Sequence, residues 1–178
     1  MNYQLFELIN NAAGRVDWID DVLEFAATWL IYGVFAVAAV LVAVAAHRRR
    51  LQAVVEIGAT LVLAFLTATV LAHLSHELRP FQSHSVHQLV AHSGGVSLPS
   101  DHATAAFTLA FAIGLFLDRT WGTILLVAAV VIGFARVWAG LHYPGDILAA
   151  AIIAALAVLE VWVASRWRHA LMPSGSAG

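Results

Sequence analysis

The sequence has no cysteine and no lysine, and only 11% of its 178 residues are charged. Without cysteine, the chain can form neither disulfides nor thiolate metal sites. Soluble domains contain about 25% charged residues and roughly 45–50% apolar residues. This chain is 61% hydrophobic, and its mean hydropathy is +0.84. The composition therefore excludes an ordinary soluble domain and predicts a protein that lies in a lipid bilayer.

Long apolar runs separated by short polar breaks predict an all-α fold, a polytopic membrane helical bundle with about five transmembrane helices. The runs cover residues 22–46, 52–74, 101–117, 121–139 and 146–164. The chain start does not resemble a signal peptide, because it lacks a basic region and contains three acidic residues in its first 20. We expect a single membrane domain at 1–170, with an amphipathic interfacial segment at 1–21 and a disordered tail at 171–178.

Arginine positions predict how the helices are oriented. Three clusters follow the first, third and fifth predicted helices: Arg48 to Arg50, Arg119, and Arg166 with Arg168. Cytoplasmic loops are enriched in basic residues, so we expect these clusters to lie on the cytoplasmic side. The N-terminus and the segments 75–100 and 140–145 then lie outside, and the C-terminus is cytoplasmic.

Two of the three arginines left on the outer side, Arg79 and Arg136, need another explanation. A guanidinium is a permanently charged planar fork, suited to binding a phosphate or carboxylate through two hydrogen bonds. Arg136 lies near the end of an apolar helix, where a cation is costly unless it meets an anion or snorkels to the interface. The pair therefore indicates an anion site, although snorkelling alone would also explain Arg136.

Ser100 and Asp101 stand at the predicted start of the third helix. Unpaired backbone N–H groups and the helix dipole favour an anion at this position. Either side chain could instead simply cap the helix, and capping is compatible with phosphate binding. Both residues are therefore candidate phosphate ligands.

His142 and Asp146 are four residues apart, and Pro144 with Gly145 marks a turn between them. Across this turn the carboxylate can reach the imidazole, fix its tautomer and leave the other ring nitrogen free to attack. A purely structural pair would look the same in sequence. His102, on the same predicted face, can protonate a departing oxygen near neutral pH. Together with the two arginines, these histidines supply the nucleophile, the acid and the charge-stabilising groups that phosphoryl transfer needs.

Five more histidines crowd the end of the second predicted helix and the loop after it: His73, His76, His84, His87 and His92. A metal or haem site must therefore be considered. No second acidic cluster accompanies these histidines, haem would need facing histidines within the helices, and loop histidines are usually solvated. We expect no metal and no cofactor.

Glu77 is a possible supporting residue of the site. It could hold Arg79 or a water molecule, and the sequence does not choose between them.

These motifs resemble the three-part signature of the type 2 phosphatidic acid phosphatase superfamily. That signature is a lysine with Arg-Pro, then Pro-Ser-Gly-His, then Ser-Arg with a histidine and an aspartate. The matching residues are Arg79-Pro80, Pro99-Ser100-Asp101-His102, and Ala135-Arg136 followed by His142 and Asp146. Three positions depart from the family pattern. Asp101 replaces glycine, Ala135 replaces serine, and the family's lysine would fall on Ala72.

The resemblance implies a role for each matching residue. It implies that the phosphate is bound by Arg79, Ser100 and Arg136. It also implies that His102 protonates the leaving group, while His142 becomes phosphorylated and Asp146 orients it. Catalysis in the family is metal-independent and passes through a phosphohistidine.

Other features are similar to the bacitracin-resistance (BcrC-type) branch of the superfamily. They are the start Met-Asn-Tyr, the run Glu77-Leu-Arg79-Pro80-Phe81, the spaced His84, His87 and His92, and the stretch from Ser97 to Thr104. That branch is similar in its aspartate before the second-motif histidine and in its small size. The likeness implies undecaprenyl diphosphate as substrate, dephosphorylated on the outer face of the bacterial cytoplasmic membrane to recycle the lipid carrier of peptidoglycan synthesis.

Two rival functions stay open on the sequence. A broader lipid phosphatase could act on phosphatidic acid, phosphatidylglycerol phosphate or another isoprenoid diphosphate. A transporter or flippase could bind a lipid phosphate at the two arginines without chemistry, but it would leave His102 and the His142–Asp146 pair without a role. The expected partners are a lipid phosphate and the bilayer, with no nucleic acid. The sequence indicates neither the oligomeric state nor the path by which lipid reaches the site.

Overall fold

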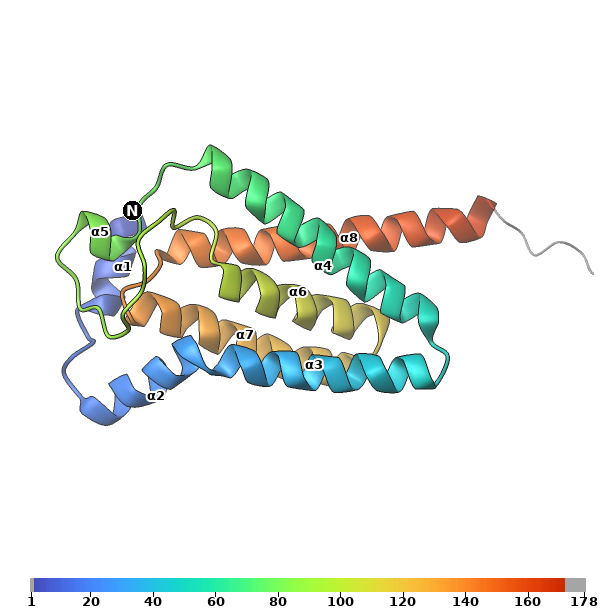
Figure 1. The fold of residues 1–178 in the computed structure, drawn as a ribbon, viewed down its shortest axis with the longest axis horizontal. Helices are drawn as coiled ribbons and strands as arrows, with labels where there is room; N and C mark the ends of the chain where they lie inside the picture. Colours follow the sequence, from blue (N-terminus) through green and yellow to red (C-terminus); the bar gives the residue numbers. More distant parts are fainter. Residues whose placement is uncertain (1, 172–178) are drawn as a thin grey trace, which may run out of the picture.

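The computed structural model describes residues 2–171, most of which lie in helices (Figure 1). The helices are α1 (Asn2–Asn10), α2 (Asp17–Thr28), α3 (Leu30–His47), α4 (Leu51–Leu74), α5 (Pro80–Ser83), α6 (Asp101–Phe116), α7 (Arg119–Trp138) and α8 (Pro144–Leu171). Within residues 2–171 there is no strand, and the β pairing is limited to one isolated antiparallel bridge between Leu78 and Val96. The predicted all-helical fold is confirmed.

Four helices are long and apolar enough to cross a membrane: α3, α4, α7 and α8. The remaining predicted span, α6, has 16 residues. At about 1.5 Å per residue it rises only about 24 Å, less than the ~30 Å of a hydrocarbon core. The bounds predicted for α4, α6 and α7 agree with the structure to within two residues. The chain is a multi-span membrane protein with one shortened helix.

The first predicted span, 22–46, is wrong at its start, because the chain breaks between α2 and α3 at Trp29. Trp29 has φ −109° and ψ −26°, and α3 begins just after it. The carbonyl of Ala27, near the end of α2, accepts a hydrogen bond from Arg136 Nη1 over 3.3 Å. The break presents a backbone oxygen to a buried cation, and an apolar run in the sequence cannot indicate such a tertiary contact.

Both ends of the chain also differ in detail from the expected bounds. The segment predicted to be interfacial, 1–21, contains α1 and the first turn of α2. At the other end α8 continues to Leu171 rather than stopping at residue 164, because residues 146–171 contain no glycine or proline to break it. Of the predicted tail, residues 172–178 lie outside the described residues. The single domain at 1–170 stays a prediction.

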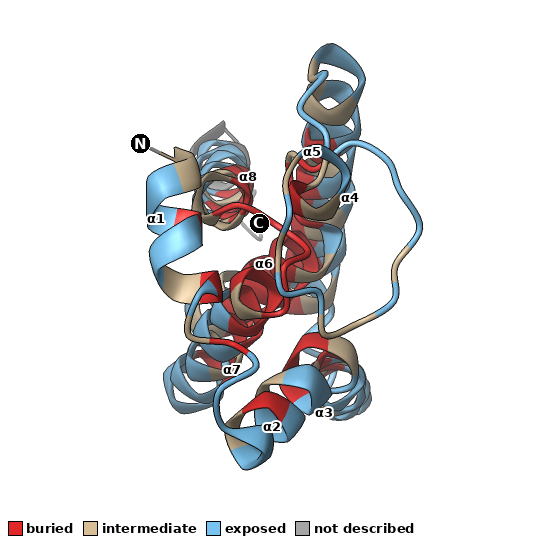
Figure 2. Cartoon of the chain, turned by 90° about the vertical axis from the view of Figure 1, so that its left-hand side faces the viewer, coloured by how far each residue is buried: buried red, intermediate tan, exposed pale blue. Residues whose placement is uncertain are grey.

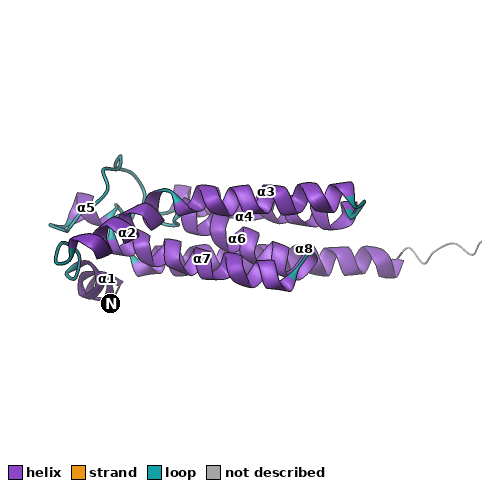
Figure 3. Ribbon diagram, turned by 90° about the horizontal axis from the view of Figure 1, so that it is seen from below, coloured by secondary structure: helices purple, strands orange, loops and turns teal. Residues whose placement is uncertain are grey.

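The short helix α6 lies in the middle of the bundle. It packs against α7, α8, α4 and α3, and Figure 3 shows it between the α3–α4 side and the α7–α8 side. Its buried side chains are mostly small: Ala103, Ala105, Ala106, Ala110 and Ala112 are at most 3% exposed. In lipid the hydrophobic effect does not drive helices together, so close approach through small residues supplies van der Waals packing instead.

The two ends of the bundle differ in what they carry. The α3–α4 and α6–α7 turns, with Arg48 to Arg50 and Arg119, lie at the end where α8 finishes (Figure 1). The opposite end holds α1, α2, α5, the chain between α4 and α6, and the α7–α8 turn. We call it the motif end. Figure 2 looks onto it and shows the buried residues concentrated around α6. All three sequence motifs therefore meet at one end.

The contact between α6 and α7 provides a test of this packing. A Cβ on Gly122 would lie 2.2 Å from Gly114 Cα. We therefore expect Gly122→Ala to push the helices apart and to lower the free energy of unfolding by about 1–3 kcal/mol. Gly58 of α4 has nothing within 4 Å of the same position, so Gly58→Ala is the matched control. Reversible unfolding in detergent measures both variants, and equal stabilities would contradict the close approach.

Candidate active site

The chain between α4 and α6 folds back on itself and brings the first two motifs side by side. Leu78 and Val96 form the antiparallel bridge, and the Ser97 N–H donates to the Glu77 carbonyl over 2.8 Å. Arg79, which immediately precedes α5, therefore lies next to the stretch that leads into α6. A pairing between residues about 20 positions apart thus places an arginine beside the start of the central helix.

Helix α1 holds this folded chain against the end of α7. The side-chain amide of Asn10, which is 2% exposed, donates to the carbonyls of His87 and Trp138, each over 2.8 Å. Its oxygen accepts from the His87 N–H over 2.9 Å. Phe6 packs edge-on against Tyr143 in the α7–α8 turn, with ring centroids 5.5 Å apart. One N-terminal helix therefore joins the chain before α6 to the turn after α7.

His142 lies in the α7–α8 turn and is 1% exposed, and its Nε2 faces two guanidinium groups. Arg79 Nη1 lies 3.1 Å from Nε2, and Arg136 Nη2 lies 3.4 Å from it. Guanidinium nitrogens can only donate, so Nε2 is the unprotonated acceptor of a neutral ring. Its lone pair is therefore directed at the two arginines, where a phosphate bound by both would present its phosphorus.

The other ring nitrogen of His142, Nδ1, faces oxygen atoms. It lies 3.0 Å from the Ser97 carbonyl and 3.3 Å from Asp146 Oδ2, so it carries the proton of the neutral ring. Asp146 is fully buried, and its Oδ2 also accepts from Ser97 Oγ over 2.5 Å and from the Tyr143 N–H over 2.8 Å. These contacts fix both the tautomer and the orientation of the imidazole.

Ser97 is a site residue that the sequence reasoning missed. Its carbonyl contacts His142 and its hydroxyl donates to Asp146. In the sequence it stood out only as the first residue of a stretch that resembles the bacitracin-resistance branch. A loop serine has no spacing that marks it as a hydrogen-bond partner, and the pairing of the folded chain with Glu77 is what places it.

The protonation of His142 follows from its surroundings. Burial lowers its pKa below the ordinary value of about 6.5, and the positive charges of Arg136 and Arg79 act in the same direction. The hydrogen bond to Asp146 opposes them by favouring the charged ring. The net effect is a lowered pKa, so the ring is neutral at physiological pH. His142 therefore keeps a free lone pair on Nε2 at pH values somewhat below 6.5.

Three donors of the motif residues are buried and have no hydrogen-bond partner among the described residues: Arg79 Nε, Arg136 Nε and Ser100 Oγ. Ser100 is the N-cap residue of α6, but its side chain makes no capping hydrogen bond. Capping therefore does not explain this hydroxyl. Buried polar groups are nearly always paired, and each exception needs an explanation. Two guanidinium forks and a hydroxyl around one nucleophilic nitrogen can together bind the oxygens of a phosphate.

Asp101 and His102, which follow Ser100 in the second motif, lie near this cluster. His102, in the first turn of α6, is half-buried and within electrostatic range of Arg136 and His142. Its imidazole can carry a proton to or from a group bound near His142. Asp101 is exposed, and its negative charge acts on Arg79 and Arg136. As an exposed carboxylate it would repel a phosphate, so any contribution to binding would come from its backbone N–H at the helix start.

Glu77 contacts α1. Its exposed carboxylate accepts a hydrogen bond from the Asn2 side-chain amide over 3.4 Å. Burial of part of the side chain raises the pKa of Glu77, and the nearby negative charge of Asp146 raises it further. The sequence suggested that Glu77 holds either Arg79 or a water molecule. The contact that the structure shows is a different one, with Asn2.

The histidines near the end of α4 and in the following chain make separate contacts. His73 Nδ1 lies 2.8 Å from the Thr69 carbonyl of its own helix. The His84 ring contacts the Tyr3 ring at a tilt of 38°, with centroids 3.9 Å apart. Among residues 2–167, no three histidine or carboxylate side chains are arranged to hold a metal ion. The expectation of catalysis without metal or cofactor stays a prediction.

Comparison with known proteins identifies the family. The family model described as the PAP2 superfamily matches residues 53–170, a range that contains all three motifs. The chain belongs to the PAP2 superfamily. This confirms the resemblance inferred from the motifs.

Two relatives match this PAP2 chain over most of its length. It is 31% identical to undecaprenyl-diphosphatase BcrC of Bacillus subtilis (strain 168) over 156 residues, which cover 86% of this chain and 79% of the relative. It is 34% identical to the putative undecaprenyl-diphosphatase YbjG of Escherichia coli (strain K12) over 168 residues, 92% of this chain and 84% of the relative. Among solved structures, LpxE of Aquifex aeolicus superposes with a TM-score of 0.75 at 26% identity, covering 90% of this chain and 94% of that one.

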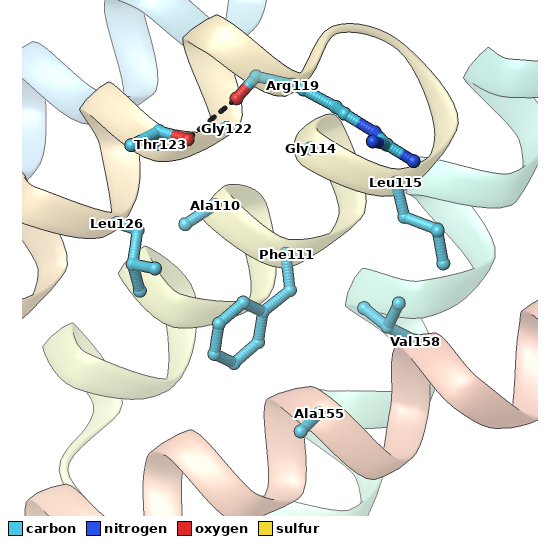
Figure 4. Close-up of a pocket in the computed structure, with 10 residues that line it drawn as sticks. All are labelled: Ala110, Phe111, Gly114, Leu115, Arg119, Gly122, Thr123, Leu126, Ala155 and Val158. Atoms are coloured by element: carbon cyan, nitrogen blue, oxygen red, sulfur yellow. Dashed lines mark hydrogen bonds between the residues drawn. The ribbon is translucent and has the colours of Figure 1, made fainter.

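A groove of about 460 Å³ lies near the α6–α7 turn, at the opposite end of this PAP2 bundle (Figure 4). Figure 4 shows Phe111 directed toward α8 near Ala155, and Arg119 extending toward Leu115 at the rim. Apart from Arg119 and Thr123 its lining is apolar, and none of the motif residues takes part in it. Because no motif residue lines the groove, we assign it no catalytic role.

The neutrality of His142 can be tested directly. Because burial lowers its pKa, we expect the ring to protonate with a midpoint below pH 6.5 in nitrogen-15 histidine NMR spectra of the protein in detergent. The His142→Gln variant assigns the resonance. Asp146→Asn removes an interaction that favours the charged ring and should move the midpoint further down. A wild-type midpoint at or above pH 6.5 would contradict the burial argument.

Proposed function

We propose that this chain is a lipid-phosphate phosphatase that hydrolyses undecaprenyl diphosphate to undecaprenyl phosphate and inorganic phosphate. The observation that carries the proposal is the buried His142 ring, whose unprotonated Nε2 lies 3.1 Å and 3.4 Å from the guanidinium groups of Arg79 and Arg136. Two relatives that match over most of the chain carry the name undecaprenyl-diphosphatase. Those names support this choice of lipid.

In the first step, His142 Nε2 attacks the terminal phosphorus of the diphosphate. An N–P bond forms while the bond from phosphorus to the bridging oxygen breaks, and the electron pair of that bond leaves with undecaprenyl phosphate. Protonated His102 gives its proton to the bridging oxygen. The positive charge that develops on the His142 ring is stabilised by Asp146 through Nδ1–H. The products are a phosphohistidine and the released lipid monophosphate.

In the second step, water attacks the phosphorus of the phosphohistidine. His102, neutral after the first step, accepts a proton from this water. The N–P bond breaks, its electron pair returns to Nε2, and inorganic phosphate leaves. His142 is neutral again and His102 is protonated, so the cycle closes without a net change in the protein.

The arginines bind the phosphoryl group that is transferred. The phosphoryl oxygens carry negative charge throughout, and Arg79, Arg136 and Ser100 hold buried donors around the attacking nitrogen. Removing one such donor from a preorganised anion site costs on the order of 10²–10³ in rate. A transporter would need the arginines alone. The fixed tautomer of His142, aligned by Asp146 and Ser97, favours catalysis over transport.

We also propose that the site faces the outside of the bacterial cytoplasmic membrane, with the N-terminus outside and the C-terminus cytoplasmic. The arginine-bearing turns lie at the end opposite to the motif end, and basic turns favour the cytoplasmic side. A site at the end of the bundle can take a diphosphate from the membrane interface while the prenyl chain stays among lipid chains. No cavity for the whole lipid is then needed.

The test is phosphate release by the purified full-length protein in detergent, with EDTA present. Undecaprenyl diphosphate, phosphatidic acid and phosphatidylglycerol phosphate are offered at matched concentrations, and His142→Gln controls for contaminating phosphatases. We expect undecaprenyl diphosphate to give the highest kcat/KM. EDTA should have no effect, because no proposed step uses a metal. A higher kcat/KM for another lipid would overturn the substrate, and EDTA inhibition reversed by a divalent ion would overturn the metal-free mechanism.

A further inference from the structure

The motifs assign no role to residues 92–97, a segment that lies next to Arg79. This segment runs antiparallel to the chain around Arg79, as the Leu78–Val96 bridge shows. Gln82 of α5 joins these two segments: its Oε1 accepts from the Gly95 N–H over 2.8 Å and from the Arg79 N–H over 3.4 Å. The backbone of residues 92–97 is therefore held at the arginine.

Gly94 shows how closely this segment packs. A Cβ on Gly94 would lie 2.6 Å from Gln82 Nε2, so a larger residue would displace the glutamine that holds Arg79 and Gly95. Gly95, with φ +148°, has a backbone conformation that side chains rarely allow. Glycine is therefore favoured at both positions of the backbone that follows His92 and Ser93.

His92 lies between two points at which its segment contacts the site. Val90 packs against the buried cluster that includes Ala135 and Leu141, the neighbours of Arg136 and His142 in the sequence, and Gly95 is bound to Gln82 beside Arg79.

His92 itself is half-buried, and its Nδ1 donates to the Ser93 carbonyl over 2.8 Å. This leaves Nε2 as the ring atom available to a ligand. Its charge interacts with three groups of the site, Arg79, Arg136 and Asp101, and His102 in turn is affected by His92. His92 thus lies among the residues to which we assign phosphate binding and proton transfer.

We propose that His92 is a further phosphate-binding residue, which donates from protonated Nε2 to a phosphoryl oxygen. The proposal rests on the proposed function, because it concerns the same phosphate.

The surroundings make this contact depend on pH. Burial lowers the pKa of His92, the Ser93 carbonyl and the charge of Asp101 oppose this, and the charges of Arg79 and Arg136 lower it further. A bound phosphate adds negative charge next to the ring and raises the pKa. The ring therefore takes up a proton as phosphate binds. The gain in affinity is present at low pH and is lost as pH rises through the pKa of the bound state.

The test is equilibrium dialysis with radiolabelled inorganic phosphate, on the full-length wild type and on His92→Gln, from pH 6 to pH 8.5. The ratio of the two dissociation constants cancels the ionisation of phosphate itself. One charge-assisted hydrogen bond predicts that the variant binds about tenfold more weakly at pH 6, with a ratio that approaches one at pH 8.5. His92→Lys, which keeps its charge, should bind more tightly than the wild type at pH 8.5.

His76→Gln is the matched control, since His76 is an exposed histidine of the same chain. It should bind phosphate as the wild type does at every pH. A His92→Gln ratio of one throughout would overturn the proposal, and so would a weakening that does not change with pH, because that would mean a structural role. Phosphate binding is measured without turnover, so the pH-dependent ratio can hold even if undecaprenyl diphosphate proves not to be the substrate.

Discussion

The guanidinium groups of Arg136, which is buried, and of Arg79, which is half-buried, are both directed at one nitrogen of His142, and the rest of this structure depends on this constraint. Cations removed from water are costly unless an anion or a set of acceptors meets them. Arg136, 3% exposed, has the Ala27 carbonyl as one acceptor, and the charge of Asp101 acts on both arginines. A phosphate supplies the negative charge that the free site lacks. The feature that is unfavourable in the free protein is therefore the one that selects an anion.

The departures from regular helical packing all serve this cluster. The break at Trp29 releases a carbonyl toward Arg136. The short α6 packs against four helices largely through alanines, and its N-cap residue Ser100 is buried. Asn10 holds the chain before α6 against the end of α7. Small residues permit close helix contacts in lipid, and the positions left polar are concentrated at the motif end.

Hydropathy and motif spacing predict the parts that depend on local sequence. They place α4, α6 and α7 correctly, and they select Arg79, Arg136, His142 and Asp146, which the structure brings together. They do not predict features made by contacts between distant segments. The break at Trp29 depends on an arginine over 100 residues away. The contacts of Ser97 depend on the pairing of its segment with the segment around Glu77. Neither the break nor this pairing leaves a periodic pattern in the sequence.

The central claim is that His142 Nε2 attacks phosphorus, and trapping the covalent intermediate tests it most directly. Undecaprenyl diphosphate labelled with phosphorus-32 at its terminal phosphate is mixed with the purified protein and quenched rapidly with alkali, in which phosphohistidine survives. Peptide mass spectrometry then locates the label. The account predicts a phosphate on His142 that forms and decays at rates compatible with turnover. Label on a different residue, or turnover by a His142→Gln variant at the wild-type rate, would contradict it.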